Sequence, residues 1–153
     1  MKKILIMGAG GQIGTELKKH LRAIYGDENV IASDIIVNPE DKNSMALNAM
    51  DRHAIQEVVE KNQIDTIYNL VALLSAKGEL SPEWAWKVNM TALLNTLEVA
   101  VKCGCQVFTP SSIGAFGDNA PKDNTPQDTA MHPDTMYGIC KVTGELLRKL
   151  GID

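Results

Sequence analysis

Close to its beginning the chain reads Ile4-Leu5-Ile6-Met7-Gly8-Ala9-Gly10-Gly11-Gln12-Ile13-Gly14. Four consecutive apolar residues are typical of a buried strand, and the glycines that follow them predict a sharp turn. Beyond the turn, apolar residues recur at helical spacing until Tyr25, where Gly26 is a natural helix stop. Residues 4–25 therefore predict a strand, a tight turn and a helix, in that order.

The rest of the chain keeps this alternation. We expect further strands at residues 30–33, 66–70 and 105–109, helices through 55–59, 82–100 and 134–150, and loops at 38–44 and 110–133. Alternating strands and helices predict a Rossmann-like, doubly wound parallel sheet with helices on both faces. Since no repeat and no linker-like stretch interrupts the pattern, we expect one domain over residues 1–153.

The composition excludes several classes of protein. Of the 153 residues, 44% are hydrophobic and 5% aromatic, and the net charge is −4, so the chain can build a core but is not expected to bind nucleic acid. No apolar run approaches the roughly 20 residues that span a bilayer, and three cysteines form no disulfide framework. The three histidines show no metal-ligand spacing. We therefore expect a cytoplasmic protein without a membrane partner or a metal.

The glycine turn and an aspartate predict a dinucleotide site. Gly8, Gly11 and Gly14 follow the pattern G-x-x-G-x-x-G, whose missing β-carbons allow a pyrophosphate to approach the N-terminus of the helix. Asp34 stands 20 residues after Gly14, at the end of the second strand, where a carboxylate can accept both ribose hydroxyls. Because an acidic group repels a 2′-phosphate and no arginine follows it, NAD is favoured over NADP. The alternative is an ordinary glycine turn and a solvated aspartate.

A tyrosine and a lysine predict proton transfer in the last helix. Tyr137 and Lys141 are four residues apart and therefore share one helix face. A free phenol keeps its proton at neutral pH, whereas a lysine ammonium one turn away and the positive nicotinamide ring both favour the phenolate. Ser111 and Ser112 follow the fourth strand, where open α/β sheets bind ligands, and we expect one of them to serve only in turn hydrogen bonds. An exposed pair without catalytic meaning is the alternative for Tyr137 and Lys141.

These motifs together resemble the extended short-chain dehydrogenase/reductase family, in its NAD-dependent epimerase/dehydratase group. Within that group the chain is most similar to the short-chain type of L-threonine 3-dehydrogenase, through residues 72–79, 110–117 and 125–138. The resemblance runs from Met1 to about Leu150. It implies a small-molecule substrate, L-threonine, which NAD would oxidise to 2-amino-3-oxobutyrate in threonine catabolism.

The resemblance also implies a role for each matching residue. Tyr137 would be the catalytic base, Lys141 would hold the nicotinamide ribose, Ser112 would bind the reacting hydroxyl, and Ser75 would contact the substrate. The remaining contacts to the cofactor would come from Gln12, Ile13, Asn48, Ala49, Leu70, Ala72 and Asn89. Asn48 stands where the family often has an aspartate, and Val71 replaces a small alanine beside the cofactor.

Family members are considerably longer, so the resemblance implies that residues 1–153 lack the C-terminal substrate lobe. Two other functions stay open beside the dehydrogenase. One is a sugar-nucleotide epimerase or dehydratase on the same scaffold, and the other is a non-catalytic NAD-binding or interaction module. Related enzymes pair through the helices expected at 82–102 and 135–150, which implies a homodimer.

Overall fold

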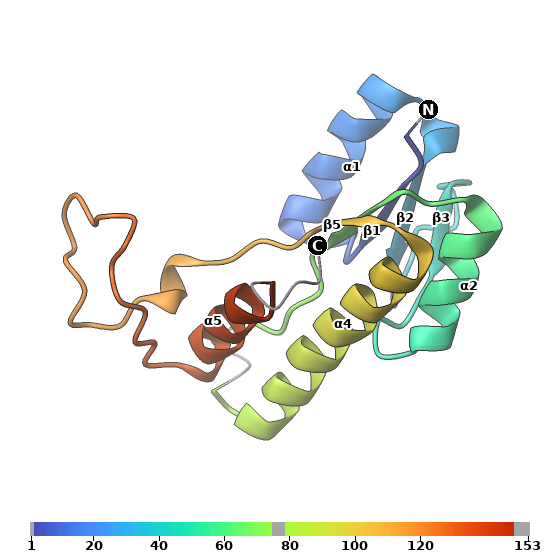
Figure 1. The fold of residues 1–153 in the computed structure, drawn as a ribbon. Helices are drawn as coiled ribbons and strands as arrows, with labels where there is room; N and C mark the ends of the chain where they lie inside the picture. Colours follow the sequence, from blue (N-terminus) through green and yellow to red (C-terminus); the bar gives the residue numbers. More distant parts are fainter. Residues whose placement is uncertain (1, 75–78, 149–153) are drawn as a thin grey trace. The chain divides into compact units, whose positions relative to one another are not determined.

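The computed structural model describes residues 2–74 and 79–148 (Figure 1). The strands are β1 (Ile4–Met7), β2 (Val30–Asp34), β3 (Ser44–Ala46), β4 (Thr66–Asn69) and β5 (Gln106–Phe108). The helices are α1 (Gln12–Tyr25), α2 (Arg52–Asn62), α4 (Pro82–Cys103) and α5 (Met136–Arg148), and the short 3₁₀ turns are η1 (Asp27–Asn29) and η2 (Ile113–Ala115). This is the alternation of strands and helices that the sequence predicts.

The chain forms two compact units. The sheet unit consists of residues 1–71 and 91–110, and the helix unit consists of residues 72–90 and 111–153. Helix α4 contributes residues 82–90 to the helix unit and residues 91–103 to the sheet unit. The single domain expected over residues 1–153 stays a prediction.

Within the described residues, the sheet has five strands in the order β3-β2-β1-β4-β5, and every neighbouring pair is parallel. Ile4 of the central strand pairs with Val30 on one side and with Thr66 on the other. One expectation was wrong, because β3 begins at Ser44, where the sequence led us to expect a polar loop. This strand has only three residues and lies at the edge of the sheet without a buried side chain, so it carries no apolar run that could reveal it.

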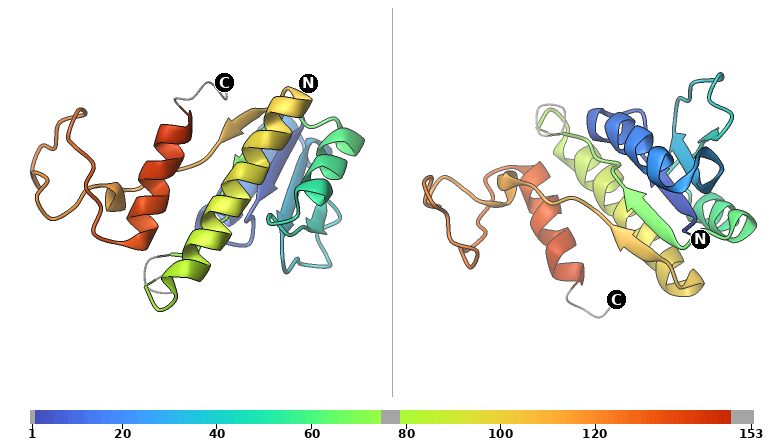
Figure 2. Two further views of the ribbon diagram at one scale, coloured as in Figure 1. Left: turned by 60° about the horizontal axis from the view of Figure 1, so that its bottom comes forward. Right: turned by 90° about the horizontal axis from the view of Figure 1, so that it is seen from above.

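The core of the sheet unit lies on both faces of β1, which explains why this strand is apolar throughout. Ile4 and Ile6 pack with Leu21 of α1 on one face. Leu5 and Met7 pack on the other face with Ile55, Val59 and Val99, which belong to α2 and α4. Figure 2 shows the sheet with α1 and α2 on opposite sides. Full burial of each of these large side chains stabilises the fold by about 1.5–3 kcal/mol, and the arrangement confirms the predicted parallel sheet with helices on both faces.

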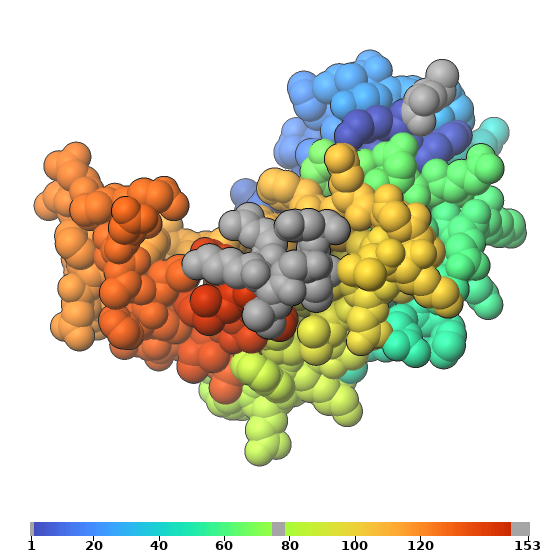
Figure 3. All heavy atoms as spheres, in the orientation of Figure 1, coloured from blue at the N-terminus to red at the C-terminus, as the bar shows by residue number. Residues whose placement is uncertain are grey.

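The helix unit contains α5 and the irregular segment that leads to it. Residues 118–128 are exposed except for Ala120, and in Figure 3 their orange atoms stand out from the red atoms of α5. Helix α5 begins at Met136, two residues after the expected start. Leu146, which the periodicity places on the apolar side of this helix, is 50% exposed in the chain. Among the described residues, no helix has both the length and the apolar character that a membrane crossing requires.

Candidate functional site

The glycine turn is held close to its neighbouring strands. The N–H groups of Gly8 and Ala9 both donate to the carbonyl oxygen of Ser33, at 2.9 and 3.0 Å. Gly8 has φ +81°, a conformation that side chains disfavour, and a β-carbon there would lie 3.0 Å from the backbone of Leu70. A β-carbon on Gly14 would overlap the carbonyl oxygen of Gly8. These two glycines therefore let α1 start directly against the end of β1.

The N-terminus of α1 is open to solvent. Gly11 occupies the N-cap and brings no side chain, and the first turn contains no acidic residue. Gln12 and Ile13, the first two residues of the helix, are exposed, and Ile13 shows 62% of its surface. The first N–H groups of a helix have no partner inside the helix and carry its positive dipole end. This end of α1 can therefore bind an anion such as a phosphate.

Asp34 lies at the end of β2 with its carboxylate fixed toward the glycine turn. One oxygen, Oδ2, accepts the N–H of Gly10 at 2.9 Å, and Oδ1 accepts the N–H of Ile35 at 2.7 Å. A carboxylate oxygen accepts more than one hydrogen bond, so both atoms can still receive ribose hydroxyls. Gly10 did not belong to the predicted site. A β-carbon on it would lie 3.0 Å from Oδ2, so a side chain at this position would crowd the aspartate.

Three further predicted residues belong to the sheet unit. Leu70 follows β4 and donates its N–H to the carbonyl oxygen of Met7, which places it at the same edge of the sheet as the glycine turn. Ala49 is buried. Asn48 is exposed, and its Oδ1 accepts the N–H of Met50 at 3.0 Å, which stabilises the turn before α2. In open parallel sheets, the edge where the strands end is the ligand-binding edge.

Helix α5 of the helix unit presents Tyr137 and Lys141 together. The Lys141 Nζ atom lies 5.3 Å from the centroid of the Tyr137 ring. Burial lowers the pKa of Lys141 from its ordinary value, and the neighbouring Cys140 thiol acts in the opposite direction. The predicted pair thus exists as a side-chain contact on one face of the helix.

Ser112 lies beside the same tyrosine. Its Oγ caps η2 by accepting the N–H of Gly114 at 3.1 Å. A β-carbon on Gly114 would meet Ser112 Oγ and Tyr137 Cδ1 at 3.5 Å each, so the serine hydroxyl and the tyrosine ring flank this glycine. The other serine, Ser111, instead donates to Glu145 further along α5. The segment after β5 therefore runs against α5 and places Ser112 and Tyr137 next to the same glycine.

Asn89 fixes the stretch that begins with Ala72. Its Oδ1 accepts the N–H of Leu73 at 2.7 Å, and its Nδ2 donates to the carbonyl oxygen of the same residue at 3.2 Å. Burial raises the pKa of the Cys140 thiol, and the nearby Asn89 amide acts in the opposite direction. Asn89 is buried, and these internal contacts were not revealed by the sequence, whereas its contact with the cofactor stays a prediction. Ser75, the predicted substrate contact, lies outside the described residues.

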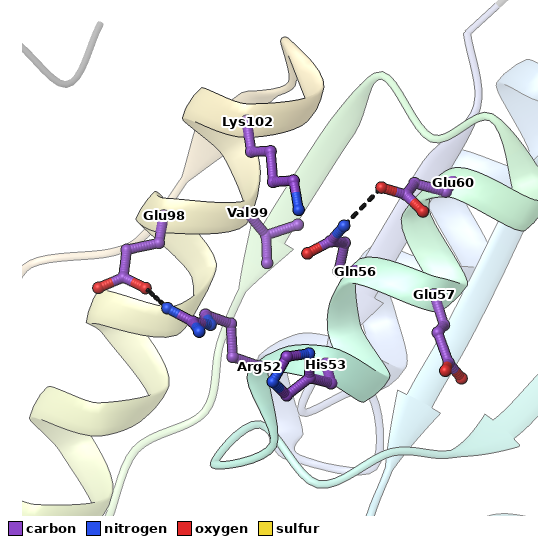
Figure 4. A pocket seen from close by; sticks show the side chains of 8 residues that line it. All are labelled: Arg52, His53, Gln56, Glu57, Glu60, Glu98, Val99 and Lys102. Carbon is purple, nitrogen blue, oxygen red and sulfur yellow. Dashed lines mark hydrogen bonds and ion pairs between the residues drawn. The ribbon is translucent and has the colours of Figure 1, made fainter.

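A hollow of about 410 Å³ lies between α2 and α4 in the sheet unit (Figure 4). It is lined by Arg52, His53, Gln56, Glu57, Glu60, Glu98, Val99 and Lys102. Two pairs within this set bind each other, Arg52 with Glu98 and Gln56 with Glu60, each at 2.6 Å. None of the predicted site residues lines it. In the part of the chain that the structure describes, no group of three His, Cys, Asp or Glu residues could hold a metal ion.

A sequence profile described as "NAD dependent epimerase/dehydratase family" matches residues 4–149 of this chain. This chain belongs to that family. An uncharacterised epimerase/dehydratase of Staphylococcus saprophyticus is 48% identical over an alignment that covers 100% of this chain and 51% of the relative. A second one, from Staphylococcus haemolyticus, is also 48% identical, with the same coverage. The chain therefore spans about half the length of the curated relatives it matches.

Solved structures of dehydrogenases and epimerases share the fold. An L-threonine dehydrogenase from Clostridium difficile has a TM-score of 0.92 and 51% identity, and the match covers 97% of this chain and 48% of that chain. A GalE-like L-threonine dehydrogenase from Cupriavidus necator, in its holo form, has a TM-score of 0.93 and 49% identity, with 97% and 49% covered. A UDP-glucose 4-epimerase from Thermotoga maritima has a TM-score of 0.86 and 25% identity, with 97% and 50% covered.

Membership of the NAD-dependent epimerase/dehydratase family confirms the predicted enzyme family and its cofactor, NAD. The sheet unit suits that cofactor in both charge and hydrogen bonding. The positive, open end of α1 complements the negative charge of a pyrophosphate, and the Asp34 carboxylate can accept hydrogen bonds from the hydroxyls of a ribose. Which single residues contact NAD stays a prediction.

Proposed function

We propose that this chain carries the NAD-binding and proton-transfer residues of an L-threonine dehydrogenase. The observation that carries the proposal is that Ser112 and Tyr137 both lie next to Gly114, with Lys141 against the tyrosine ring. Support comes from the L-threonine dehydrogenases of C. difficile and C. necator, which are 51% and 49% identical to this chain. The UDP-glucose 4-epimerase is 25% identical, so the dehydrogenase is favoured.

In this proposal, each residue near Tyr137 has a separate task. The Ser112 hydroxyl donates a hydrogen bond to the β-hydroxyl oxygen of L-threonine and holds it beside the phenol. Tyr137 takes the proton of that hydroxyl, and the Lys141 ammonium stabilises the phenolate that accepts it. When bound, NAD accepts the hydride from the carbon that carries this hydroxyl, so the alcohol becomes a ketone and the product is 2-amino-3-oxobutyrate. Ser75 contributes a further contact to the substrate.

The residues of the sheet unit bind the adenosine half of the cofactor. Asp34 accepts the ribose hydroxyls, and the backbone of Gly8, Gly11, Gln12, Ile13 and Gly14 receives the pyrophosphate. Asn48, Ala49 and Leu70 add further contacts from the sheet unit, and Ala72 and Asn89 are proposed as the cofactor contacts of the helix unit. We further propose a cytoplasmic enzyme of threonine catabolism. We also propose that it forms a homodimer through the helices at 82–102 and 135–150, where Trp84 and Trp86 are 50% and 43% exposed.

Replacement of the proposed base tests the activity. Tyr137→Phe removes the proton acceptor but keeps the ring, so threonine-dependent NADH formation is expected to fall by roughly 10²- to 10⁴-fold. Tyr25→Phe, at the far end of α1 from the glycine turn, is the matched control and is expected to retain the wild-type rate. Equal rates in the Tyr137→Phe variant and the wild-type chain would contradict the assignment.

The two alternative functions have different signatures on the same chain. A sugar-nucleotide epimerase converts a UDP-hexose without net formation of NADH. A non-catalytic module binds NAD in calorimetry but turns over neither threonine nor a UDP-hexose. Calorimetry and the two steady-state assays, carried out on one preparation, therefore separate all three.

A further inference from the structure

The start of α5 is capped by a residue that is distant in sequence. The Oε1 atom of Glu79 accepts the N–H of Met136, the first residue of the helix, at 2.9 Å. A local cap is also present, because Thr135 Oγ1 accepts the N–H of Gly138 at 3.0 Å. Only the Glu79 contact joins two segments that are 57 residues apart in the chain. It also places a carboxylate at the positive end of the helix dipole.

Tyr137 stands between two fixed points of the backbone. Met136 on one side is held by Glu79. Gly138 on the other side lies so close to η2 that a β-carbon there would overlap the carbonyl oxygen of Gly114. Two anchors on the residues immediately before and after the tyrosine restrict both the position of its Cα atom and the direction in which its side chain leaves the helix.

We propose that Glu79 is a positioning residue, which holds the first turn of α5 so that Tyr137 and Lys141 stay in register with Ser112. The inference rests on the proposed function of these three residues. Glu79 acts through the backbone of Met136 and has no part in the chemistry. It therefore affects how often the phenol and the serine hydroxyl are aligned, not their chemical nature.

Three variants separate the cap from its charge. Glu79→Ala removes both, and Glu79→Gln keeps a hydrogen-bond acceptor without the charge. Glu83→Ala is the matched control, since it removes the same side chain from the first turn of a different helix, α4. Hydrogen exchange of peptides that cover residues 136–141 measures the cap directly. The rate of acylation of Lys141 by acetic anhydride is the second measurement. Neither of them depends on turnover.

In Glu79→Ala, the amides at the start of α5 are expected to exchange roughly 2- to 30-fold faster, as after loss of a helix cap. Lys141 is half-buried, and it should be acylated faster in the same variant. The kcat for threonine oxidation should fall by about ten- to a hundred-fold, with the KM for NAD unchanged. Glu79→Gln should recover most of each change, and Glu83→Ala should show none of them.

Two results would overturn the inference. One is that the rates of hydrogen exchange and of Lys141 acylation in Glu79→Ala equal those in Glu83→Ala. The other is faster exchange with an unchanged kcat, which would reduce Glu79 to a structural cap. If the wild-type chain oxidises no threonine, the proposed function fails, and exchange and Lys141 acylation then decide alone whether Glu79 positions α5.

Discussion

Helices α1 and α5 begin in the same way but end up with different tasks. In each, the third residue is a glycine, Gly14 or Gly138, and a β-carbon at that position would overlap the carbonyl oxygen of an earlier glycine, Gly8 or Gly114. Both helices therefore start in direct contact with another stretch of backbone. The close approach fixes where each helix begins relative to the segment before it.

The two N-termini differ in what covers them. At α1 the N-cap is Gly11, which has no side chain, and no acidic residue lies in the first turn. At α5 the Thr135 hydroxyl and the Glu79 carboxylate accept N–H groups of the first turn. An uncovered N-terminus can bind a phosphate, whereas a covered one cannot. The difference indicates that α1 offers its backbone to a ligand, and that α5 is a rigid support for the side chains of Tyr137 and Lys141.

The largest effect is expected from a change at the contact of α1. Gly14→Ala forces a methyl group onto Gly8 and Ala9, whose Cα atom would lie 2.7 Å from it, so the first turn of α1 must move away from β1. We expect a loss of about 3 kcal/mol in the free energy of unfolding, at the upper end for an overpacked core, and a loss of NAD binding. Urea denaturation and calorimetry measure the two quantities.

Gly11→Ala is the control for this prediction. A β-carbon on Gly11 would lie 3.5 Å from the Gly8 carbonyl oxygen, which is an ordinary contact. Its free energy of unfolding should change by less than about 1 kcal/mol. If Gly14→Ala is as stable as Gly11→Ala, the close start of α1 is not required.

At the contact of α5, the corresponding change should act on catalysis more than on the cofactor. Gly138→Ala forces a methyl group onto the Gly114 carbonyl oxygen and the Pro133 side chain, so α5 must separate from η2. We expect a loss of about 1–3 kcal/mol in the free energy of unfolding. We also expect a larger loss of threonine oxidation than of NAD affinity, because the anion site on α1 is untouched. Steady-state kinetics and calorimetry on one preparation measure both, and an equal loss of the two would contradict the division of tasks between the helices.

The sequence predicted the contact of α1 better than that of α5, and the reason is the separation of the partners. Gly8 and Gly14 are six residues apart, between a strand and a helix whose periodicities are plain, so the turn and its likeness to a dinucleotide site were predictable. Gly114 and Gly138 are 24 residues apart, across a segment without periodicity. No local pattern relates them, although Tyr137 and Lys141 were found from their own spacing.

The other features that the sequence did not predict also depend on residues that are distant in the chain. Strand β3 exists through its pairing with β2, and its three residues carry no signal of their own. Gly10 was part of a recognised glycine run, but the tight space beside it depends on where the Asp34 carboxylate lies. The contacts of Glu79 with Met136 and of Asn89 with Leu73 are set by tertiary structure and cannot be derived from spacing. Local chemistry was predictable, and long-range positioning was not.

The smallest effect concerns how α1 is held while its N-terminus stays open. Near its other end, Arg22 binds the Asp41 carboxylate at 2.8 Å, and Lys18 binds the same oxygen at 3.1 Å. The hydrogen bond from Arg22 holds the pKa of Asp41 below its ordinary value, although burial acts in the opposite direction. A carboxyl group with a lowered pKa in the folded state stabilises the fold above its unfolded pKa, near 4, and this contribution is lost as the pH falls through the folded value.

Asp41→Asn should therefore lower the free energy of unfolding by about 1.5 kcal/mol at pH 7, at the lower end of the range for hydrogen bonds to charged groups. The difference in the free energy of unfolding between this variant and the wild-type chain should shrink as the pH falls below about 4. Urea denaturation at a series of pH values measures it, with the exposed Asp128→Asn as the control for a change of net charge. NAD affinity at pH 7 should stay within about three-fold of wild type, because the anchor lies away from the glycine turn. A difference that stays constant as the pH falls below about 4 would show that Asp41 acts through packing and not through its charge.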